Sequence, residues 1–329
     1  MLSRRLGRMG PAVSAIGLGA MGMSDFYGHA DEAESTATIH AALEAGVTLI
    51  DTGDFYGMGH NEMLIGDALK GSKRDKAILS VKYGAQRGPD GAFLGFASDP
   101  ASTKTAIAYT LKRLRVDYID IYRPARVSPT VPIEDTIGAI ADLVKAGYVR
   151  HIGLSEAGPE NIRRAHKVHP IVDLQIEYSI MTRSVEDKIL PVLRELGIGM
   201  TAYGVLSRGL ISEGALGGQS MGGFRSHSPR FQGDNLSQNL TLVQALKAIA
   251  DEKGCTVAQL AIAWVAQRGD DIVPLVGARR QERLAEALVA LDITLSPQEL
   301  GRIDAAVPVG AVAGMRYAPE QMAMLDSER

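Results

Sequence analysis

The chain has 329 residues and only one cysteine, Cys255. A single cysteine cannot form an intramolecular disulfide, and its scarcity suits a protein of a reducing compartment. Residues that favour helices surround Cys255, so buried packing is a more ordinary role for it than nucleophilic catalysis. The sequence therefore excludes a disulfide framework.

An excess of positive charge and long apolar segments are also missing. The formal net charge is -3, which provides no basic field for nucleic acid or an anionic membrane. No apolar run approaches the ~18 residues of a membrane span, and the first ten residues lack the apolar segment of a secretory signal. We therefore expect a cytoplasmic protein with no nucleic-acid or membrane partner, and the sequence leaves its oligomeric state open.

Metal-binding patterns are absent as well. The sequence contains no HExxH motif and no cysteine pair. Four histidines lie in polar segments that we expect at the surface: His29, His60, His166 and His169. These spacings predict no metal site.

What the sequence does contain is an alternation of short apolar runs with helical patterns. Eight runs are typical of buried strands: 15–18, 48–51, 78–82, 119–122, 151–154, 172–175, 199–202 and 272–275. Between them lie segments such as 132–146, where isoleucines recur at helical spacing after Pro132 and before Gly147. Such alternation indicates parallel strands joined by helices. Eight units predict an α/β fold, a closed (β/α)₈ TIM barrel, as a single domain over 1–329.

Three segments are longer than plain connections require. Residues 83–99 are rich in glycine and aspartate, and residues 204–239 combine glycines with four arginine or histidine positions. Loops of this length are usually functional or disordered, and we favour a lid for 204–239. We expect the long loops to lie over the C-terminal mouth of the barrel. The tail 307–329 either covers this mouth as well or is simply mobile.

Three glycines match the GxGxxG pattern of dinucleotide-binding folds: Gly17, Gly19 and Gly22. That pattern is informative only where it opens a helix directly after a strand. Here the residues SDFYGH follow, and helical apolar spacing does not begin until residue 33. We interpret the glycines as a loop at a strand end that lets the backbone approach a flat ligand.

Asp51, Tyr56 and Lys82 each follow an apolar run, in LIDTGDFYG and ILSVKYG. A barrel brings successive strand ends together, and its active site lies at the C-terminal ends. A free tyrosine titrates near 10, too high for efficient proton donation at neutral pH. A nearby lysine lowers that pKa, and a carboxylate keeps the lysine charged. Separately, each residue is more ordinarily a turn, cap or solvated side chain; together they predict a proton-donating site.

A second pattern indicates a phosphate site near the C-terminus. In IVPLVGARRQERLAEAL, a strand ends at Gly277 and a helix begins near Gln281, with Arg279, Arg280 and Arg283 at the junction. A helix N-terminus and arginines both bind phosphate, whereas arginines alone are disfavoured at that end of the helix dipole. We therefore favour a bound anion over ordinary surface arginines.

Other strand ends carry polar or aromatic residues that could hold a carboxamide or stack on a ring. These are Ser155 and Glu156 in GLSE, Gln175 and Tyr178 in LQIEYS, and Tyr203 in TAYG. Each of them alone is ordinary strand-end chemistry.

With these residues in view, the chain resembles the aldo-keto reductases over essentially its full length. The matching segments, in order, are GLGAMGMS, LIDTGDFYG, ILSVKYG, VRHIGLSE, LQIEYS and VPLVGARRQERLAEAL. The resemblance implies a (β/α)₈ barrel that binds NADPH across its mouth and delivers a hydride to a carbonyl. It also implies that Tyr56 donates the proton, that Lys82 lowers its pKa and that Asp51 pairs with Lys82.

The resemblance further implies a set of NADPH contacts. Gly19 and Met21 belong to the first glycine-rich loop; Ser155, Glu156 and Gln175 match carboxamide positions, and Tyr203 matches the residue beneath the nicotinamide. The pyrophosphate loop would be Leu206, Ser207, Arg208 and Gly209; the 2′-phosphate site Gly277, Arg279 and Arg283; and the adenine contact Glu286. Two positions depart from the family, which more often has Asn at Glu156 and at Ala287.

A third departure concerns the catalytic machinery. Relatives read like YYQHRVDP after the fourth strand, whereas this chain reads YRPARVSP and places Ala125 where the catalytic histidine belongs. Losing one such donor costs ~3 kcal/mol of transition-state stabilisation, about a hundredfold in rate. Three explanations stay open: water, Arg126 or Arg123 substitutes; alanine makes room for a bulky ketone; or the barrel is a weak catalyst.

The resulting hypothesis is an NADPH-dependent reductase of aldehydes and ketones, including bulky alicyclic or xenobiotic ketones. One alternative is a regulatory or redox-sensing barrel that binds NADPH and turns over very slowly. Another is an unrelated phosphate-binding barrel such as an isomerase, which the combined catalytic and arginine motifs disfavour.

Overall fold

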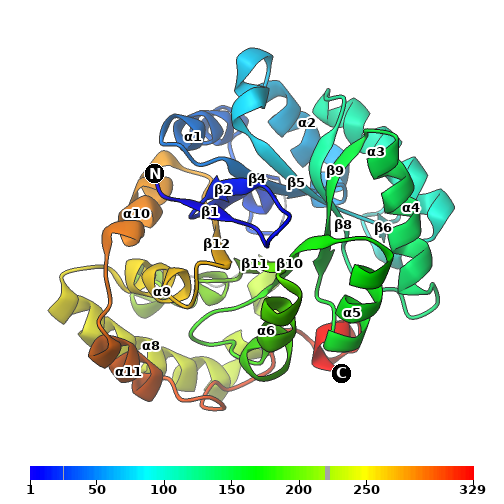
Figure 1. Cartoon of the computed structure of the whole chain (residues 1–329). Coiled ribbons are helices and arrows are strands. Elements are labelled where there is room, and N and C mark those ends of the chain that lie inside the picture. The colour runs from blue at the N-terminus through cyan, green and yellow to red at the C-terminus, as the bar shows by residue number, and fades with distance from the viewer. Residues whose placement is uncertain (25, 219–222) are drawn as a thin grey trace.

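The computed structural model describes residues 1–24, 26–218 and 223–329. Parallel strands close into a barrel in which the last strand pairs with the first (Figure 1). In order around the barrel they are β3 (Gly17–Gly19), β4 (Leu49–Gly53), β5 (Ile78–Tyr83), β8 (Ile119–Pro124), β9 (Val149–Ser155), β10 (Ile171–Glu177), β11 (Gly199–Tyr203) and β12 (Ile272–Gly277). All eight expected strands are present, and the prediction of a (β/α)₈ barrel is confirmed.

Helices surround the strands (Figure 1). The longer ones are α1 (Glu32–Glu44), α2 (His60–Ala68), α3 (Pro100–Leu114), α4 (Ile133–Lys145), α5 (Pro159–Val168), α6 (Val185–Leu196), α8 (Gly233–Lys253), α9 (Val257–Ala266), α10 (Gln281–Val289) and α11 (Pro297–Ala306). The segment expected at 132–146 is α4, whose Ile133, Ile137 and Ile140 are buried as predicted. Among the described residues, no helix combines the length and apolarity of a membrane span.

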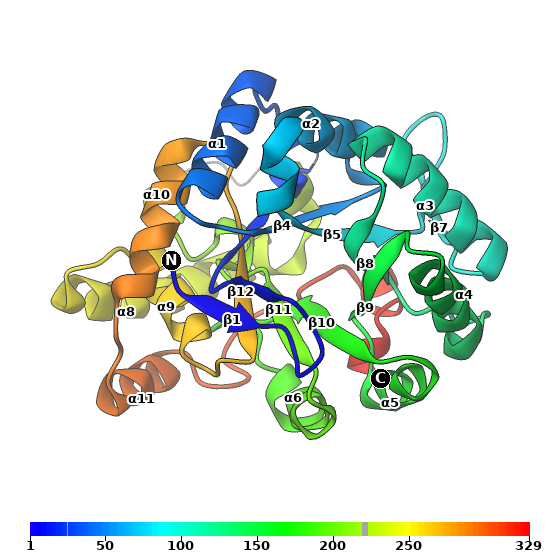
Figure 2. The same ribbon diagram turned by 45° about the horizontal axis from the view of Figure 1, so that its top comes forward.

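A short N-terminal hairpin crosses one end of the barrel in both views (Figures 1 and 2). It consists of β1 (Ser3–Arg5) and β2 (Ala12–Ser14), and it brings Leu6 and Val13 into the barrel opening. There they form a small apolar cluster with Leu49, Ile121, Val172 and Val273. The N-terminal end of the barrel is therefore filled with hydrophobic side chains.

Toward the other end, the inward-facing residues become polar. Strand side chains alternate between the barrel interior and the helices, so Leu49 and Asp51 share one face, as do Ile121 and Arg123. Arg123 is fully buried and donates to Asp173 at 2.9 Å and to Ser80 at 2.8 Å. A Cβ on Gly153 would lie 3.2 Å from this guanidinium, so glycine there leaves it room. The polar layer lies between the apolar cluster and the mouth.

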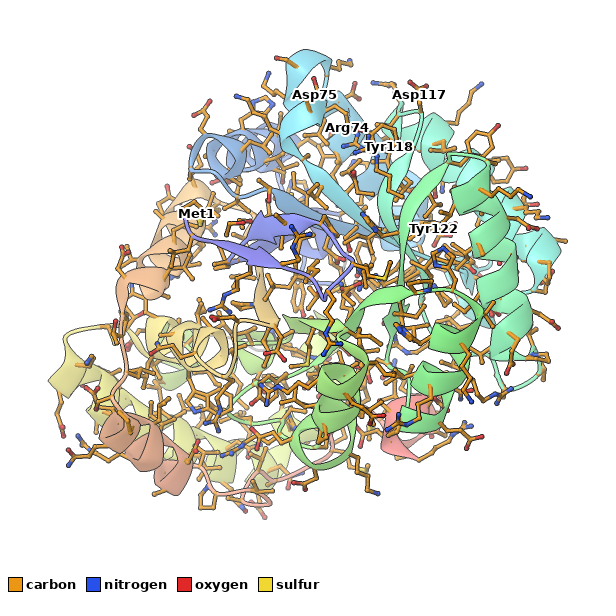
Figure 3. The ribbon with its side chains drawn as sticks, in the orientation of Figure 1. Met1, Arg74, Asp75, Asp117, Tyr118 and Tyr122 are labelled. Carbon is orange, nitrogen blue, oxygen red and sulfur yellow. The ribbon has the colours of Figure 1, made fainter. Side chains whose placement is uncertain are left out.

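Charged residues near the N-terminal strand ends serve packing. Arg74, in the 3-10 helix η3 (Gly71–Lys76), pairs with Asp120 at 2.8 Å and lies 4.5 Å from the ring centroid of Tyr118. Figure 3 shows Arg74 and Tyr118 side by side. Asp120 also accepts a hydrogen bond from the backbone N–H of Leu79. These contacts join β5 and β8 at the end away from the mouth.

The three long segments have different structures. Residues 83–99 contain an antiparallel hairpin, β6 (Ala85–Arg87) and β7 (Phe93–Phe96), which the glycine-rich sequence did not indicate. The expected lid 204–239 contains η4 (Ser207–Gly209), α7 (Glu213–Leu216), η5 (Gly223–His227), η6 (Pro229–Phe231) and the start of α8, while 219–222 lie outside the described residues. The tail carries α12 (Pro319–Met322) and η8 (Asp326–Glu328).

The C-terminal end lies beside α5 (Figures 1 and 2). Asp326 accepts hydrogen bonds from the backbone N–H of Gly158 at 2.6 Å and from Asn161 Nδ2 at 3.0 Å. Asn239 on α8 binds the tail through both the N–H and the C=O of Ala313. The tail is therefore fastened at both sides of the barrel, and it runs between these points.

The glycine pattern at 17–22 behaves as the sequence predicted. Gly17 and Gly19 lie in β3, and a short 3-10 helix, η1 (Met21–Met23), follows. The first α-helix begins only at Glu32, with Asp31 as its cap. The pattern therefore does not open a helix, and the dinucleotide-fold interpretation does not apply.

Candidate active site

Asp51, Lys82 and Tyr56 meet at the C-terminal ends of β4 and β5. Lys82 Nζ donates to Asp51 Oδ1, and it lies 5.2 Å from the ring centroid of Tyr56. The three residues are 2%, 5% and 6% exposed respectively, so the ion pair is shielded from water. Ser80 Oγ donates to Asp51 Oδ2 at 2.8 Å, which further fixes the carboxylate.

The position of Tyr56 depends on the turn after β4. Tyr56 begins the 3-10 helix η2 (Tyr56–Gly59), in which Gly57 and Met58 have φ of 55° and 53°. A Cβ on Gly57 would also lie 3.1 Å from the Ser24 side chain. This tight left-handed turn carries the chain from β4 into α2 while Tyr56 stays at the strand end. Phe55 packs edge-on against its ring, with centroids 4.7 Å apart.

Burial dominates the acid–base properties of the site. It raises the pKa of the Tyr56 phenol well above its usual value, Asp51 raises it further, and Arg126 lowers it. Burial lowers the pKa of Lys82, whereas Asp51 raises it. The sequence predicted that Lys82 would lower the pKa of Tyr56, but burial and Asp51 both raise it. Tyr56 therefore holds its proton at neutral pH, as a proton donor must before it reacts.

Ser155 and Gln175 are neighbours in register on β9 and β10. Both are 2% exposed. Gln175 Nε2 donates to Asp51 Oδ2 at 2.7 Å, so this amide is joined to the Asp51–Lys82 pair. The structure thus brings two expected carboxamide residues to the same mouth as Tyr56.

Glu156 has a different environment from the one expected of a carboxamide contact. It is fully buried with φ of 52°, and its carboxylate pairs with Arg316 from the tail at 2.5 Å. Tyr203 Oη and Ser327 Oγ also donate to it, each at 2.6 Å. Burial alone would raise the pKa of Glu156, but Arg316 prevails and the pKa falls to about 2. The side chain is a charged anchor for the tail, which gives glutamate a role at the position where the resemblance implied asparagine.

The tail also supplies Tyr317 to the mouth. Its hydroxyl lies 2.9 Å from the hydroxyl of Tyr203, the residue expected beneath the nicotinamide. The Arg208 guanidinium lies 4.0 Å from the centroid of the Tyr317 ring. The tail therefore covers the mouth, one of the two arrangements that the sequence left open.

The loop expected to bind pyrophosphate has an unusual backbone. Leu206 precedes η4, and Ser207, Arg208 and Gly209 all have positive φ, of 48°, 59° and 89°. Positive φ is uncommon outside glycine, and such conformations cluster at ligand-binding sites. Arg208 pairs with Glu177 at 3.0 Å, which holds its side chain near the mouth.

A row of arginines continues from this loop toward α10. Arg225 Nε donates to the carbonyl of Arg208 at 2.7 Å, and its guanidinium lies 5.1 Å from the Tyr27 ring centroid. Arg279 Nη1 donates to the carbonyls of residues 27–29 at 3.0 to 3.2 Å. Arg208, Arg225 and Arg279 are thereby linked through one loop into a continuous basic strip.

Two glycines and the N-terminus of α10 lie beside this basic strip. Gly19 and Gly277 are register partners where β3 and β12 end, and Met21 follows in η1. In the described part of the chain no side chain caps the N-terminus of α10 at Arg280, so the helix offers its first N–H groups. Farther along α10, Arg283 is 71% exposed in its side chain and pairs with Glu286 at 2.7 Å.

These residues fit the phosphates of a dinucleotide. The three linked arginines supply charge-assisted donors, the α10 terminus supplies N–H groups, and the facing glycines leave room for close approach. Glu286, expected to contact adenine, accepts from Thr256 Oγ1 at 3.0 Å and pairs with Arg283. Among the described residues, no cluster of three or more histidine, cysteine or acidic side chains could hold a metal ion.

Several residues of the mouth were not in the expected set. Arg225 was noted only as a basic residue of a long loop, and Arg316 and Tyr317 lie in a tail whose sequence carries no recognisable motif. Arg123, considered as a substitute donor for the histidine, is 0% exposed in the polar layer below the mouth. It therefore cannot reach a substrate there.

The family model described as the Aldo/keto reductase family matches residues 15–308. A probable aldo-keto reductase 1 of Glycine max is 42% identical over 317 residues, which are 95% of this chain and 91% of that protein.

Two solved structures show the same architecture. The glycerol dehydrogenase AKR11B4 from Gluconobacter oxydans has a TM-score of 0.86 at 27% identity, covering 96% of this chain and 98% of that one. The aldo-keto reductase AKR11C1 from Bacillus halodurans, in its holo form, has a TM-score of 0.78 at 26% identity, covering 94% and 97%.

Proposed function

Because the chain belongs to the aldo/keto reductase family of oxidoreductases, we propose that it is an NADPH-dependent reductase of aldehydes and ketones. The observation that carries this proposal is the buried Asp51–Lys82 pair beneath the protonated Tyr56. A structural role for the barrel alone does not require a buried ion pair and a buried phenol at the same strand ends.

Each residue of this site has a distinct role in the proposal. When bound, NADPH supplies a hydride to the carbonyl carbon. Tyr56 gives its proton to the carbonyl oxygen. Lys82 stabilises the phenolate that remains, and Asp51 keeps Lys82 charged and in place. Ser155 and Gln175 orient the carboxamide of the cofactor, and Tyr203 provides the aromatic surface beneath its ring.

The basic strip and α10 would hold the rest of the cofactor. Arg208, with Arg225 beside it, would hold the pyrophosphate, and Arg279 and Arg283 would hold the 2′-phosphate. NADPH carries that phosphate and NADH does not, so the two arginines at α10 favour NADPH.

The preference for bulky ketones needs a different basis from the one that the sequence suggested. Ala125 is only 1% exposed, so the space freed by the missing histidine is not an open extension of the mouth. The proposed substrates are therefore aldehydes and ketones as a class.

The test compares the wild-type chain with Tyr56→Phe. NADPH binding is measured by fluorescence, and NADPH consumption is then followed with a panel from small aldehydes to ring ketones. We expect carbonyl reduction in the wild type and a loss of at least ~100-fold in the variant with nearly unchanged NADPH affinity. Tight binding without turnover of any substrate by the wild type would instead favour the redox-sensing barrel.

A further inference from the structure

Arg126 directly follows the position of the missing histidine. The backbone N–H of Ala125 donates to the carbonyl of Tyr83 at 2.8 Å, which continues the pairing of β8 with β5 beyond the strand end. The side chain of Arg126 therefore extends from the backbone at the level where Lys82 and Tyr83 end β5. Its Nη1 donates to the carbonyl of Ala125 at 2.7 Å, and its guanidinium lies 5.7 Å from the Phe96 ring centroid.

Arg126 differs in its partners from four arginines in or below the mouth. Those four form ion pairs: Arg123 with Asp173, Arg208 and Arg230 with Glu177, and Arg316 with Glu156. Arg225 and Arg279, on the basic strip, donate to backbone carbonyls as Arg126 does. Arg126 is half-buried, yet it forms no ion pair with a carboxylate in the described part of the chain. Its only hydrogen bond to those residues is the one from Nη1 to Ala125, so the Nε and Nη2 edge has no protein acceptor there.

The charge of Arg126 acts on groups from three sides of the mouth. Burial raises the pKa of Tyr56 and Arg126 opposes it; burial lowers the pKa of Lys82 and Arg126 adds to this. Arg126 also helps to keep the pKa of Glu156 low, against the effect of burial. These residues lie after β4, on β5 and after β9, around the end of β8 from which Arg126 extends.

A half-buried cation without a carboxylate in direct contact favours binding of an anion. A guanidinium edge presents two parallel N–H donors. These match two oxygens that are bound to one carbon or to two neighbouring carbons. A 2-oxo acid has this arrangement, with the reacting carbonyl oxygen beside a carboxylate oxygen. A plain aldehyde or a ketoester lacks the negative charge.

We propose that Arg126 binds the reacting oxygen of the substrate in place of the histidine, and that it selects 2-oxo acids. This inference rests on the proposed reductase function. The guanidinium stays charged and gives up no proton, so Tyr56 remains the proton source. The carbonyl carbon accepts the hydride, its oxygen accepts the Tyr56 proton, and a 2-hydroxy acid is released while Tyr56 is reprotonated by solvent.

The first test needs no variant. The wild-type chain with NADPH is given phenylglyoxylate, its methyl ester and benzaldehyde, and kcat/KM is measured for each. We expect the acid to exceed the ester by at least ~10-fold, since only the acid has a charge for Arg126. Equal or better use of the ester would overturn the substrate class. Failure to reduce any of the three, with NADPH bound, would instead count against the reductase function itself.

The second test uses Arg126→Met and Arg126→Lys. We expect Arg126→Met to lower kcat/KM for phenylglyoxylate by ~100-fold or more, and for benzaldehyde by less, with unchanged NADPH affinity. Arg126→Lys keeps the charge but not the paired donors, so its activity should be intermediate. Arg150→Met is the control, because Arg150 is exposed at the opposite end of β9. Unaltered activity of Arg126→Met on the acid would overturn the role of Arg126.

Chemical rescue separates binding from a structural effect. In Arg126→Ala, added guanidinium chloride should restore part of the phenylglyoxylate activity, and equal sodium chloride should not. Restoration supports a direct contact with substrate. Loss of activity that guanidinium does not restore, in a variant with normal circular dichroism and NADPH binding, would count against that contact.

Discussion

Arg316 and Glu156 form a buried two-point ion pair although 160 residues separate them in the chain. Nη1 lies 2.9 Å from Oε1 and Nη2 lies 2.5 Å from Oε2, with the two side chains 4% and 0% exposed. The pair joins the C-terminal tail to the end of β9. It therefore connects the tail, which covers the mouth, with the strand end beside Gln175 and Tyr203.

Breaking this pair should release the tail. We expect Glu156→Gln to lower the free energy of unfolding by about 3 kcal/mol, because it leaves a buried guanidinium without its main carboxylate. Urea unfolding measures the loss, and limited proteolysis should cut residues 307–329 faster. Glu134→Gln is the matched control: Glu134 makes a similar two-point pair with Arg164, but both are about 40% exposed, and such pairs contribute at most about 1 kcal/mol. Equal effects of the two substitutions would contradict the anchoring role.

Asp54 predicts a pH dependence of stability. Its Oδ2 accepts from the backbone N–H of Gly84 at 3.1 Å, while Oδ1 is buried without a partner among the described residues. Burial raises the pKa of this carboxyl from 3.8 to about 7. At a pH between these two values, Asp54 keeps its proton in the folded chain and has lost it in the unfolded chain. Stability from this group should therefore fall as the pH rises from about 4 to 7, by at most about 1.4 kcal/mol per pH unit.

Asp54→Asn should remove that dependence, because the amide does not ionise. Urea unfolding at several pH values between about 4 and 7 measures the slope for both chains. Asp117→Asn is the control, since Asp117 is exposed and should leave the slope unaltered. An identical slope in wild type and Asp54→Asn would show that Asp54 ionises in the folded chain as it does in water.

Arg283 should distinguish the two nicotinamide nucleotides. We expect Arg283→Ala to weaken NADPH binding by about 10-fold or more and NADH binding by about 2-fold at most, because only NADPH carries the 2′-phosphate. Arg302→Ala is a suitable control, since Arg302 on α11 also forms an exposed pair, with Glu252 at 2.7 Å. Fluorescence titration gives both dissociation constants. A parallel decrease for the two nucleotides would remove Arg283 from the 2′-phosphate site.

Much of the site could be predicted because strand ends are a local property of the chain. Asp51 and Lys82 terminate apolar runs in the sequence, and any closed parallel barrel brings such ends together. The hairpin at 83–99 was missed because its two strands are short and the turn that joins them contains Gly88 and Gly91. The anchoring role of Glu156 was missed for another reason: its partner Arg316 lies in a tail with no periodic pattern.

The sequence by itself determined the barrel, the strand ends that carry Asp51, Tyr56 and Lys82, and the absence of a histidine at Ala125. These follow from the alternation of apolar runs and from residue identity. Only the tertiary structure decided how the charges of the mouth are distributed. Glu177 pairs with Arg208, Glu156 pairs with Arg316 and Asp173 pairs with Arg123, whereas Arg126 forms no ion pair among the described residues. The physical reason is that ion pairing depends on distance in space between residues that are remote in the chain, and no local pattern encodes that distance.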